Sequence, residues 1–383
     1  MHLSLARRRN YKGPAFFSYG YKPFFLFAGV LAAFYIPLWL LIYGFGGPWP
    51  ATIDGLSWHA HEMLFGYLGA VLTGFLLTAV PNWTGRLPIN GLGLLGLVFI
   101  WLAGRASFWL FDTSSIWPPL VDSLFLVSVA LMIWREVLLG KNWRNLPVAA
   151  IVTVFAIANI LFHFEGKIGL PPGFGQSLAL AGAAVMISFM GGRLIPSFTR
   201  NWLKSQKIKT LPAEFSWFDR VAIATTVLAG IFWVGWPDGV ITAWALVVAG
   251  ILVLGRLFRW QGIRTGRESL VWILHLGYGW VGVALLLIGG ALLWPQSIPA
   301  TSGLHALTTG GIGVMTIAVM TRATLGHSGR PRVADKITTL LYVLINLAAL
   351  IRVLAPLAPE VYYTTLVVAG IFWTLAFMLF VYR

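Results

Sequence analysis

The sequence predicts an all-α protein that crosses a membrane about twelve times, with apolar helices as its spanning elements. Hydrophobic residues make up 58% of the 383 residues and charged residues only 10%. A water-soluble domain could not cover its surface with so few polar side chains. Apolar runs of about twenty residues recur along the whole chain, and each is long enough to cross a hydrocarbon core of roughly 30 Å. The lipid bilayer is therefore the expected solvent of this chain.

The expected spans are apolar windows separated by charged residues or by Pro and Gly. They lie near residues 24–45, 58–80, 91–111, 118–139, 146–164, 176–197, 218–236, 239–258, 270–294, 302–321, 337–355 and 361–382. The first apolar run follows basic residues, but it is too long for a signal peptide and no small-residue cleavage site follows it. We expect a single integral membrane domain over residues 1–383, with a cytoplasmic segment at 1–22 and a helix bundle at 24–382.

The positions of the basic residues predict the orientation of the helices. If the N-terminus is cytoplasmic, all but three of the 27 Lys and Arg residues lie on the cytoplasmic side, the exceptions being Arg105, Lys167 and Arg352. We therefore expect a bacterial inner-membrane protein with both termini in the cytoplasm. The net charge of +15 is spread between the spans, so anionic lipid headgroups explain it better than nucleic acid does.

The similarity of three helix ends suggests an internal repeat. The second, sixth and tenth spans end in similar combinations of Pro, Thr, Gly and Arg, and successive copies are four helices apart. One interpretation is a pseudo-threefold repeat of four-helix units, since membrane folds often contain internal symmetry. An equally good one is that these residue types simply mark helix exits. The segments are Val80-Pro81-Asn82-Trp83-Thr84-Gly85-Arg86, Ile195-Pro196-Ser197-Phe198-Thr199-Arg200-Asn201-Trp202, and Met320-Thr321-Arg322 running to Gly329-Arg330.

Histidine is the main candidate for metal binding in this chain. There is no cysteine, which excludes disulfides, iron–sulfur clusters and thiolate ligands. Of the seven histidines, all but His2 and His327 lie in or at the edge of an apolar span, where ionisable residues are rare and usually functional. For His163 and His275 a hydrogen bond between helices is an equally good interpretation.

The densest group of candidates is Trp58-His59-Ala60-His61-Glu62-Met63, at the outer start of the second span. Because His59 and His61 are two positions apart on a helix, they point about 200° apart. They are expected to serve two centres, or to act as one ligand and one supporting group. Glu62 follows within the apolar run and needs a partner, a proton or a nearby cation. Glu62 is the candidate catalytic residue if the protein is an enzyme.

Four histidines, His59, His61, His163 and His305, fall at one outer level of the membrane. A b-type haem needs one or two axial imidazoles from facing helices, so we expect His61 and His305 to clamp haem b. His59 and His163, with Glu62 as a further candidate, would then hold copper, for which imidazole is a suitable ligand.

Two further candidates lie nearer the cytoplasmic side. His275 is in the ninth span, where it suits a second centre, a bond to a haem propionate or a proton relay. Arg322 follows the tenth span. Its main expected role is to anchor the helix end, and the alternative is that it clamps a haem propionate or an acidic substrate.

These residues resemble the signature of the NnrS family. The resemblance covers essentially the whole chain, and its long second-span motif is specific. It implies a twelve-helix bacterial inner-membrane protein that is associated with haem and copper, expressed with denitrification genes and protective against nitric oxide. The ligand assignments above rest on depth and residue type and not on the family. The matching segments are Trp58-His59-Ala60-His61-Glu62-Met63-Leu64-Phe65-Gly66, Gly74-Phe75-Leu76-Leu77-Thr78-Ala79-Val80-Pro81-Asn82-Trp83-Thr84-Gly85-Arg86, His305 with Gly310-Gly311-Ile312-Gly313-Val314-Met315, and Met320-Thr321-Arg322 with Gly326-His327-Ser328-Gly329-Arg330.

Two functional hypotheses follow from the residues and the resemblance together. The first is a haem protein, with copper as a second metal, that binds, reduces or detoxifies nitric oxide or protects against nitrosative stress. As an enzyme it would resemble a quinol-linked nitric oxide reductase, with Glu62 and His275 as the candidates for proton transfer. The alternative is a transporter or exporter of a small metal or nitrosyl species without redox turnover, since many helices with internal repeats also describe secondary carriers.

Overall fold

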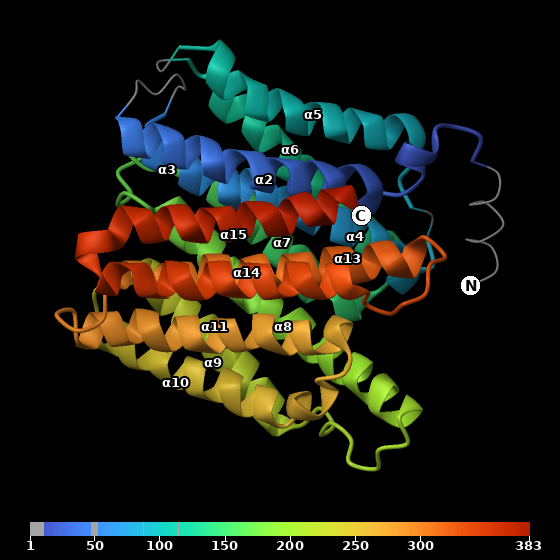
Figure 1. Cartoon of the computed structure of the whole chain (residues 1–383). Coiled ribbons are helices and arrows are strands. Elements are labelled where there is room, and N and C mark those ends of the chain that lie inside the picture. Colours follow the sequence, from blue (N-terminus) through green and yellow to red (C-terminus); the bar gives the residue numbers. More distant parts are fainter. Residues whose placement is uncertain (1–10, 47–52, 87, 113–114) are drawn as a thin grey trace. The chain divides into compact units, whose positions relative to one another are not determined.

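The protein is built from long helices joined by short turns (Figure 1). The computed structural model describes residues 11–46, 53–86, 88–112 and 115–383, and these residues form helices but no strand. Each predicted span is a helix, and eleven of the helices are long and apolar enough to cross a membrane. The remaining one is α6 (Trp117–Leu139). The predicted all-α, polytopic membrane fold is confirmed, whereas the cytoplasmic placement of both termini stays a prediction.

The chain divides into two compact units, Met1–Ala179 and Leu180–Arg383, so the boundary falls inside α8 (Phe174–Ser205). Residues 1–10 of the predicted cytoplasmic segment lie outside the described residues. In the first unit α6 packs between α5 and α7, and α4 packs against both α2 and α6. The helices of this unit are α2 (Tyr21–Phe45), the continuous run α3–η2–α4 (Gly55–Thr84), α5 (Gly91–Leu110), α6 and α7 (Leu146–Phe164).

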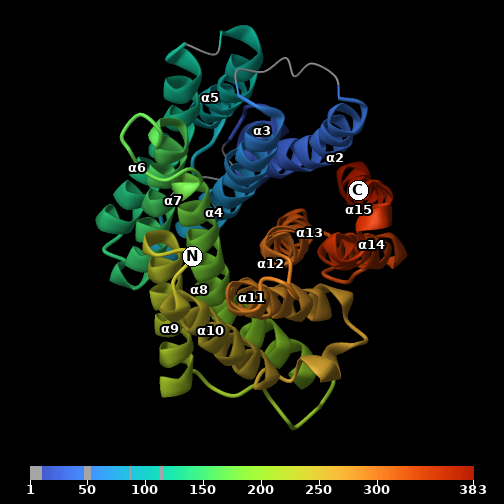
Figure 2. The ribbon, with the colours of Figure 1, turned by 90° about the vertical axis from the view of Figure 1, so that its left-hand side faces the viewer.

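The second unit also consists of neighbouring helices packed side by side. Here α10 packs between α9 and α11, and α14 packs against α15 (Figure 2). The helices are α9 (Trp217–Gly235), α10 (Val240–Phe258), α11 (Ser269–Leu293), the continuous run α12–η5–α13 (Ala300–His327), α14 (Lys336–Leu354) and α15 (Tyr362–Tyr382).

The second, sixth and tenth spans are the three longest and most buried of the eleven. Gly55–Thr84, Phe174–Ser205 and Ala300–His327 contain 30, 32 and 28 residues, and 78%, 61% and 72% of their most apolar windows are buried. The other eight reach at most 25 residues and 56%. All three run beyond their predicted cytoplasmic ends. Proline explains the first of these errors, because the predicted span stopped before Pro81 and a helix can continue through proline at the loss of one backbone hydrogen bond.

Glycine allows the first and second spans to approach each other. A Cβ atom at Gly74 would lie 2.7 Å from the ring of Phe25, and one at Gly20 would collide with Leu77. The absence of side chains at these positions lets α2 and α4 pack with Phe25 buried between them. The second span is thus held against the first near Gly74 and Leu77.

The second span begins with a capped helix, α3 (Gly55–His61). Oδ1 of Asp54 accepts hydrogen bonds from the backbone N–H groups of Leu56 and Ser57, at 3.1 and 3.0 Å. Partial burial raises the pKa of Asp54, but the hydrogen bonds from Ser57 and Leu56 lower it more, so that the pKa lies below its ordinary value of 3.8. The ionised carboxylate is therefore the form that stabilises the start of this helix.

Replacing Asp54 with alanine should lower the free energy of unfolding by about 1 kcal/mol at neutral pH, because the first turn loses its acceptor. The control is Asp54→Asn, which keeps an acceptor oxygen and should stay close to the wild type. A carboxyl group whose pKa is lower in the folded state than in the unfolded state stabilises the fold at pH values above its unfolded pKa of about 3.9. This contribution disappears as the pH falls through the pKa of the folded state. Unfolding in detergent at several pH values should therefore show the alanine deficit shrinking below about pH 4. A loss of unfolding free energy in Asp54→Ala that does not change with pH would contradict this account.

Candidate metal centre

Six buried polar side chains from the second to the fifth spans meet in the first unit. Their exposed fractions range from 0 to 6%. Such a group is exceptional in an apolar bundle, because each uncompensated polar or charged side chain costs several kcal/mol to bury. The six are His61, Glu62, Arg105, Asp122, Asn159 and His163.

A change of helix type places His61 and Glu62. His61 is the last residue of α3, and the chain continues as a π-helix, η2 (Glu62–Leu68), before α4 (Gly69–Thr84) begins. π-Helices are rare and occur frequently at functional sites. The indole Nε1–H of Trp101 donates to the Gly66 carbonyl at 3.1 Å, which ties this segment to α5. A Cβ at Gly66 would lie 2.7 Å from Oε2 of Glu62, so glycine gives this carboxylate its space.

Arg105 binds both buried carboxylates. Its Nε lies 2.9 Å from Oε1 of Glu62, and its terminal nitrogen pairs with Oδ1 of Asp122. A Cβ at Gly104 would be 3.1 Å from the Asp122 Cα, so glycine allows α5 and α6 to approach closely here. One guanidinium group thus holds together two negative charges that would otherwise repel each other.

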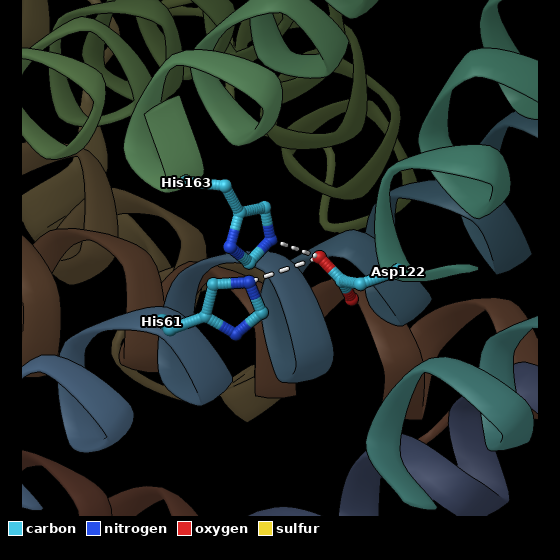
Figure 3. Close-up of side chains that lie close together, drawn as sticks. All are labelled: His61, Asp122 and His163. Carbon is cyan, nitrogen blue, oxygen red and sulfur yellow. Dashed lines mark hydrogen bonds and ion pairs between the residues drawn. The ribbon is translucent and has the colours of Figure 1, made fainter. Parts of the chain in front are cut away.

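Asp122 faces two imidazoles with its other oxygen. Oδ2 lies 3.0 Å from Nε2 of His61 and 3.0 Å from Nε2 of His163 (Figure 3). The three donor atoms all lie within 4.8 Å of one another. Because Arg105 occupies Oδ1, the oxygen that faces the histidines is fixed. Two imidazole nitrogens and one carboxylate oxygen form a suitable donor set for iron, copper or zinc, and this combination is typical of non-haem Fe(II) sites.

The neighbours of these three residues complete the arrangement. Oε1 of Glu62 is 3.2 Å from Nδ1 of His61, and metal-binding histidines commonly donate their second N–H to a carboxylate. Oδ1 of Asn159 lies 3.3 Å from Nε2 of His61 and supplies a fourth donor atom beside the site. Two carboxylates and one guanidinium leave one negative charge when the histidines are neutral. A metal cation or a protonated imidazole balances that charge.

Aromatic rings and carboxylates surround His61. Its ring is fully buried between Phe65, Phe108 and Phe162, with centroids 5.2, 4.8 and 5.2 Å away. Both ring nitrogens face carboxylates, Nδ1 towards Glu62 and Nε2 towards Asp122. The predicted haem pair of His61 and His305 stays a prediction, because His305 belongs to the second unit.

The structure separates the other candidates into different surroundings. The ring of His59 stacks on Trp39 of α2 at 4.4 Å, and the group of metal-binding donors includes His163 but not His59. In the second unit, Nε2 of His275 lies 2.8 Å from Oγ1 of Thr199. The Arg322 guanidinium lies 3.7 Å above the ring of Phe198 and donates to the Leu270 carbonyl at 3.3 Å. The predicted roles of His59, His275 and Arg322 stay predictions.

Sequence reasoning did not identify three members of the group, although the position of each one in the sequence gives a reason to expect a functional role. Asp122 is a carboxylate inside an apolar span, which is by itself a reason to expect a functional site. Asn159 precedes His163 by one helical turn and therefore lies on the same face of α7. Arg105 was an exception to the charge asymmetry, and a cation on the wrong side of the membrane points to a buried anionic partner.

Comparison with known proteins now identifies the family. The family model described as NnrS protein matches residues 15–383. This chain belongs to the NnrS family. The comparison with curated proteins found no match. The resemblance seen in the second-span motif is confirmed, and in this NnrS family member that motif supplies His61 and Glu62 to the buried group.

Removing the guanidinium should destabilise the protein strongly. Arg105→Ala leaves Glu62 and Asp122 buried without their cation, and the expected loss is about 3–5 kcal/mol of unfolding free energy, measured by unfolding in detergent. The matched control is Arg135→Ala, because Arg135 is 67% exposed and lies 3.9 Å from Glu136. That change should cost at most about 1 kcal/mol. Equal losses in the two variants would show that Arg105 does not hold the carboxylates in place.

Proposed function

We propose that this chain is a metal-dependent membrane protein of the nitric oxide response that binds nitric oxide at a metal ion held by His61, Asp122 and His163. Membership of the NnrS family supports the link to nitric oxide. The observation that carries the proposal is the convergence of two imidazole nitrogens and one carboxylate oxygen within 4.8 Å. Copper or iron suits this donor set and this family.

The residues around the donors prepare the site for a small neutral molecule. Glu62 accepts the Nδ1–H of His61, which directs the Nε2 lone pair towards the metal position. Arg105 orients Asp122, and the three phenyl rings around His61 exclude water. The bound ion would supply open coordination positions, because three protein ligands do not fill its shell. Nitric oxide is uncharged and can enter such an apolar region from the bilayer, whereas hydrated ions are excluded.

Reduction of nitric oxide is the enzymatic form of this proposal. Two molecules of nitric oxide, two electrons and two protons give nitrous oxide and water, with quinol as the expected electron donor. Glu62 is the carboxyl group expected to pass a proton to the site, since it contacts both Arg105 and His61. Turnover of nitric oxide should therefore be more sensitive to Glu62→Gln than the binding of nitric oxide is.

Metal analysis of the purified protein tests the proposal. His163→Ala and Asp122→Ala should lose the bound metal and the electron paramagnetic resonance signal of its nitric oxide adduct, because each change removes a ligand. Glu62→Gln should weaken metal affinity by about 10–100-fold, as expected for a group that supports a ligand. The control is His327→Ala, at the last residue of α13 (Met315–His327), which should keep both metal and adduct.

Circular dichroism and size-exclusion chromatography establish that each variant is folded. Folded His163→Ala and Asp122→Ala proteins that keep the full metal content would overturn the assignment of these ligands. A wild-type protein that binds the metal but forms no adduct would overturn the nitric oxide proposal alone.

A further inference from the structure

Asn159 brings an unpaired amide group to the donor triad of His61, Asp122 and His163. The side chain of Asn159 is 1% exposed, and its Oδ1 lies 3.3 Å from Nε2 of His61. Its Nδ2 is buried and has no hydrogen-bond partner among the described residues. A buried donor without a partner costs free energy, so such a group in a native protein needs an explanation.

The contact with His61 does not satisfy this amide once a metal is bound. Nε2 of His61 then gives its lone pair to the metal, and Nδ1 donates its proton to Glu62. Nε2 therefore carries no hydrogen that Oδ1 of Asn159 can accept. Both ends of the amide are then unpaired beside an ion with open coordination positions.

Other asparagines in the helical part of this chain are paired. Asn145 is 2% exposed, and its Nδ2 donates to Oδ1 of Asn142 at 3.0 Å. Nδ2 of Asn346 donates to the Tyr342 carbonyl at 2.8 Å. Burial in the bundle does not by itself leave an amide unpaired, so Asn159 differs from these residues in its surroundings.

Two functions suit an unpaired amide in this place. Its oxygen can be a further metal ligand, or its N–H groups can donate to a molecule that the metal binds. Carbonyl oxygens suit magnesium, calcium and manganese, whereas imidazole suits iron and copper. The amide nitrogen offers two N–H donors, and it is attached to the same carbon as the oxygen that lies 3.3 Å from Nε2 of His61. For iron or copper the N–H groups are therefore the more useful part of Asn159.

Arg105 also has a buried nitrogen without a partner in the described structure, but it lies on the other side of the carboxylate. Its guanidinium binds Oδ1 of Asp122, whereas the two imidazoles face Oδ2. The carboxylate group thus separates Arg105 from the metal position. Asn159, in contact with Nε2 of His61, is on the side of the ligands.

We propose that an amide N–H of Asn159 donates a hydrogen bond to nitric oxide bound at the metal of the donor triad. The proposal rests on the function proposed for that triad and adds the residue that recognises the bound molecule. Negative charge develops on nitric oxide when it binds a reduced metal ion. A fixed donor stabilises that charge strongly in a region from which water is excluded.

The nitric oxide adduct of the purified full chain tests this role. Asn159→Leu removes the amide and keeps a side chain of similar size. The variant should keep the metal content of the wild type but release nitric oxide roughly 2–10-fold faster, as expected for the loss of one neutral hydrogen bond. The N–O stretching frequency of its adduct should rise, because a hydrogen bond to the oxygen weakens the N–O bond. The matched control is Asn145→Leu, whose adduct should behave as in the wild type.

Thermal unfolding of the metal-free proteins separates a functional amide from a structural one. Nδ2 of Asn159 has no partner to lose, and Nε2 of His61 has a closer acceptor in Asp122, at 3.0 Å. Metal-free Asn159→Leu should therefore unfold at the temperature of the wild type or above it. Asn145→Leu should unfold at a lower temperature, because it breaks the hydrogen bond to Asn142.

Three results would overturn the role of Asn159 alone. Loss of metal from Asn159→Leu would make this residue a ligand. An unchanged release rate and stretching frequency would show that its N–H does not reach nitric oxide. A metal-free Asn159→Leu protein that unfolds as early as Asn145→Leu would make the amide structural. Asn159→Ala repeats each measurement with a smaller side chain if leucine does not fit. A wild-type protein that forms no adduct would instead overturn the proposed function together with this inference.

Discussion

The double ion pair of Arg105 with Glu62 and Asp122 is the interaction on which the candidate site depends. In an apolar interior two carboxylates cannot both stay ionised without compensation. Arg105 cancels one negative charge and, by binding Oδ1 of Asp122, turns Oδ2 towards His61 and His163. The remaining negative charge makes a cation favourable at this point. The contact that joins three spans therefore also leaves the negative charge that would attract a cation.

Burial limits which species could reach the candidate site. The same phenyl rings that enclose His61 raise the cost of admitting any charged or strongly hydrated species. Admitting a neutral diatomic molecule costs little free energy, and such a molecule can reach the site through the bilayer. Arg105 and Glu62 satisfy part of the buried polar group internally, whereas Oε2 of Glu62, a terminal nitrogen of Arg105 and Nδ2 of Asn159 are buried without a hydrogen-bond partner among the described residues.

The sequence predicts the fold well and the site only in part, for a physical reason. In a bilayer every apolar run must satisfy its own backbone hydrogen bonds, so length and hydropathy suffice to place the helices. Which residues meet is decided by packing between helices. Gly104 brings α5 against α6, and only this approach allows Arg105 to reach Asp122. The π-helix after His61 has no sequence signal of its own, so the direction of the imidazole could not be derived from helical spacing.

The second, sixth and tenth spans are the three longest of the apolar helices but carry different polar groups. The repeat of four-helix units that their similar ends suggest stays a prediction. The second and tenth spans share the histidine at an α-to-π junction, but within the described part of the chain only the first unit adds a carboxylate and a second imidazole beside it. The sixth span is similarly long, at 32 residues, but less buried, at 61% of its most apolar window, and it has no histidine and no π-helix. There the guanidinium of Arg256 presses against Gly192 and pairs with Asp219 at 2.8 Å. The second span thus contributes to a donor triad, the tenth carries a single imidazole, and the sixth contacts an ion pair, according to the side chains that the neighbouring helices contribute.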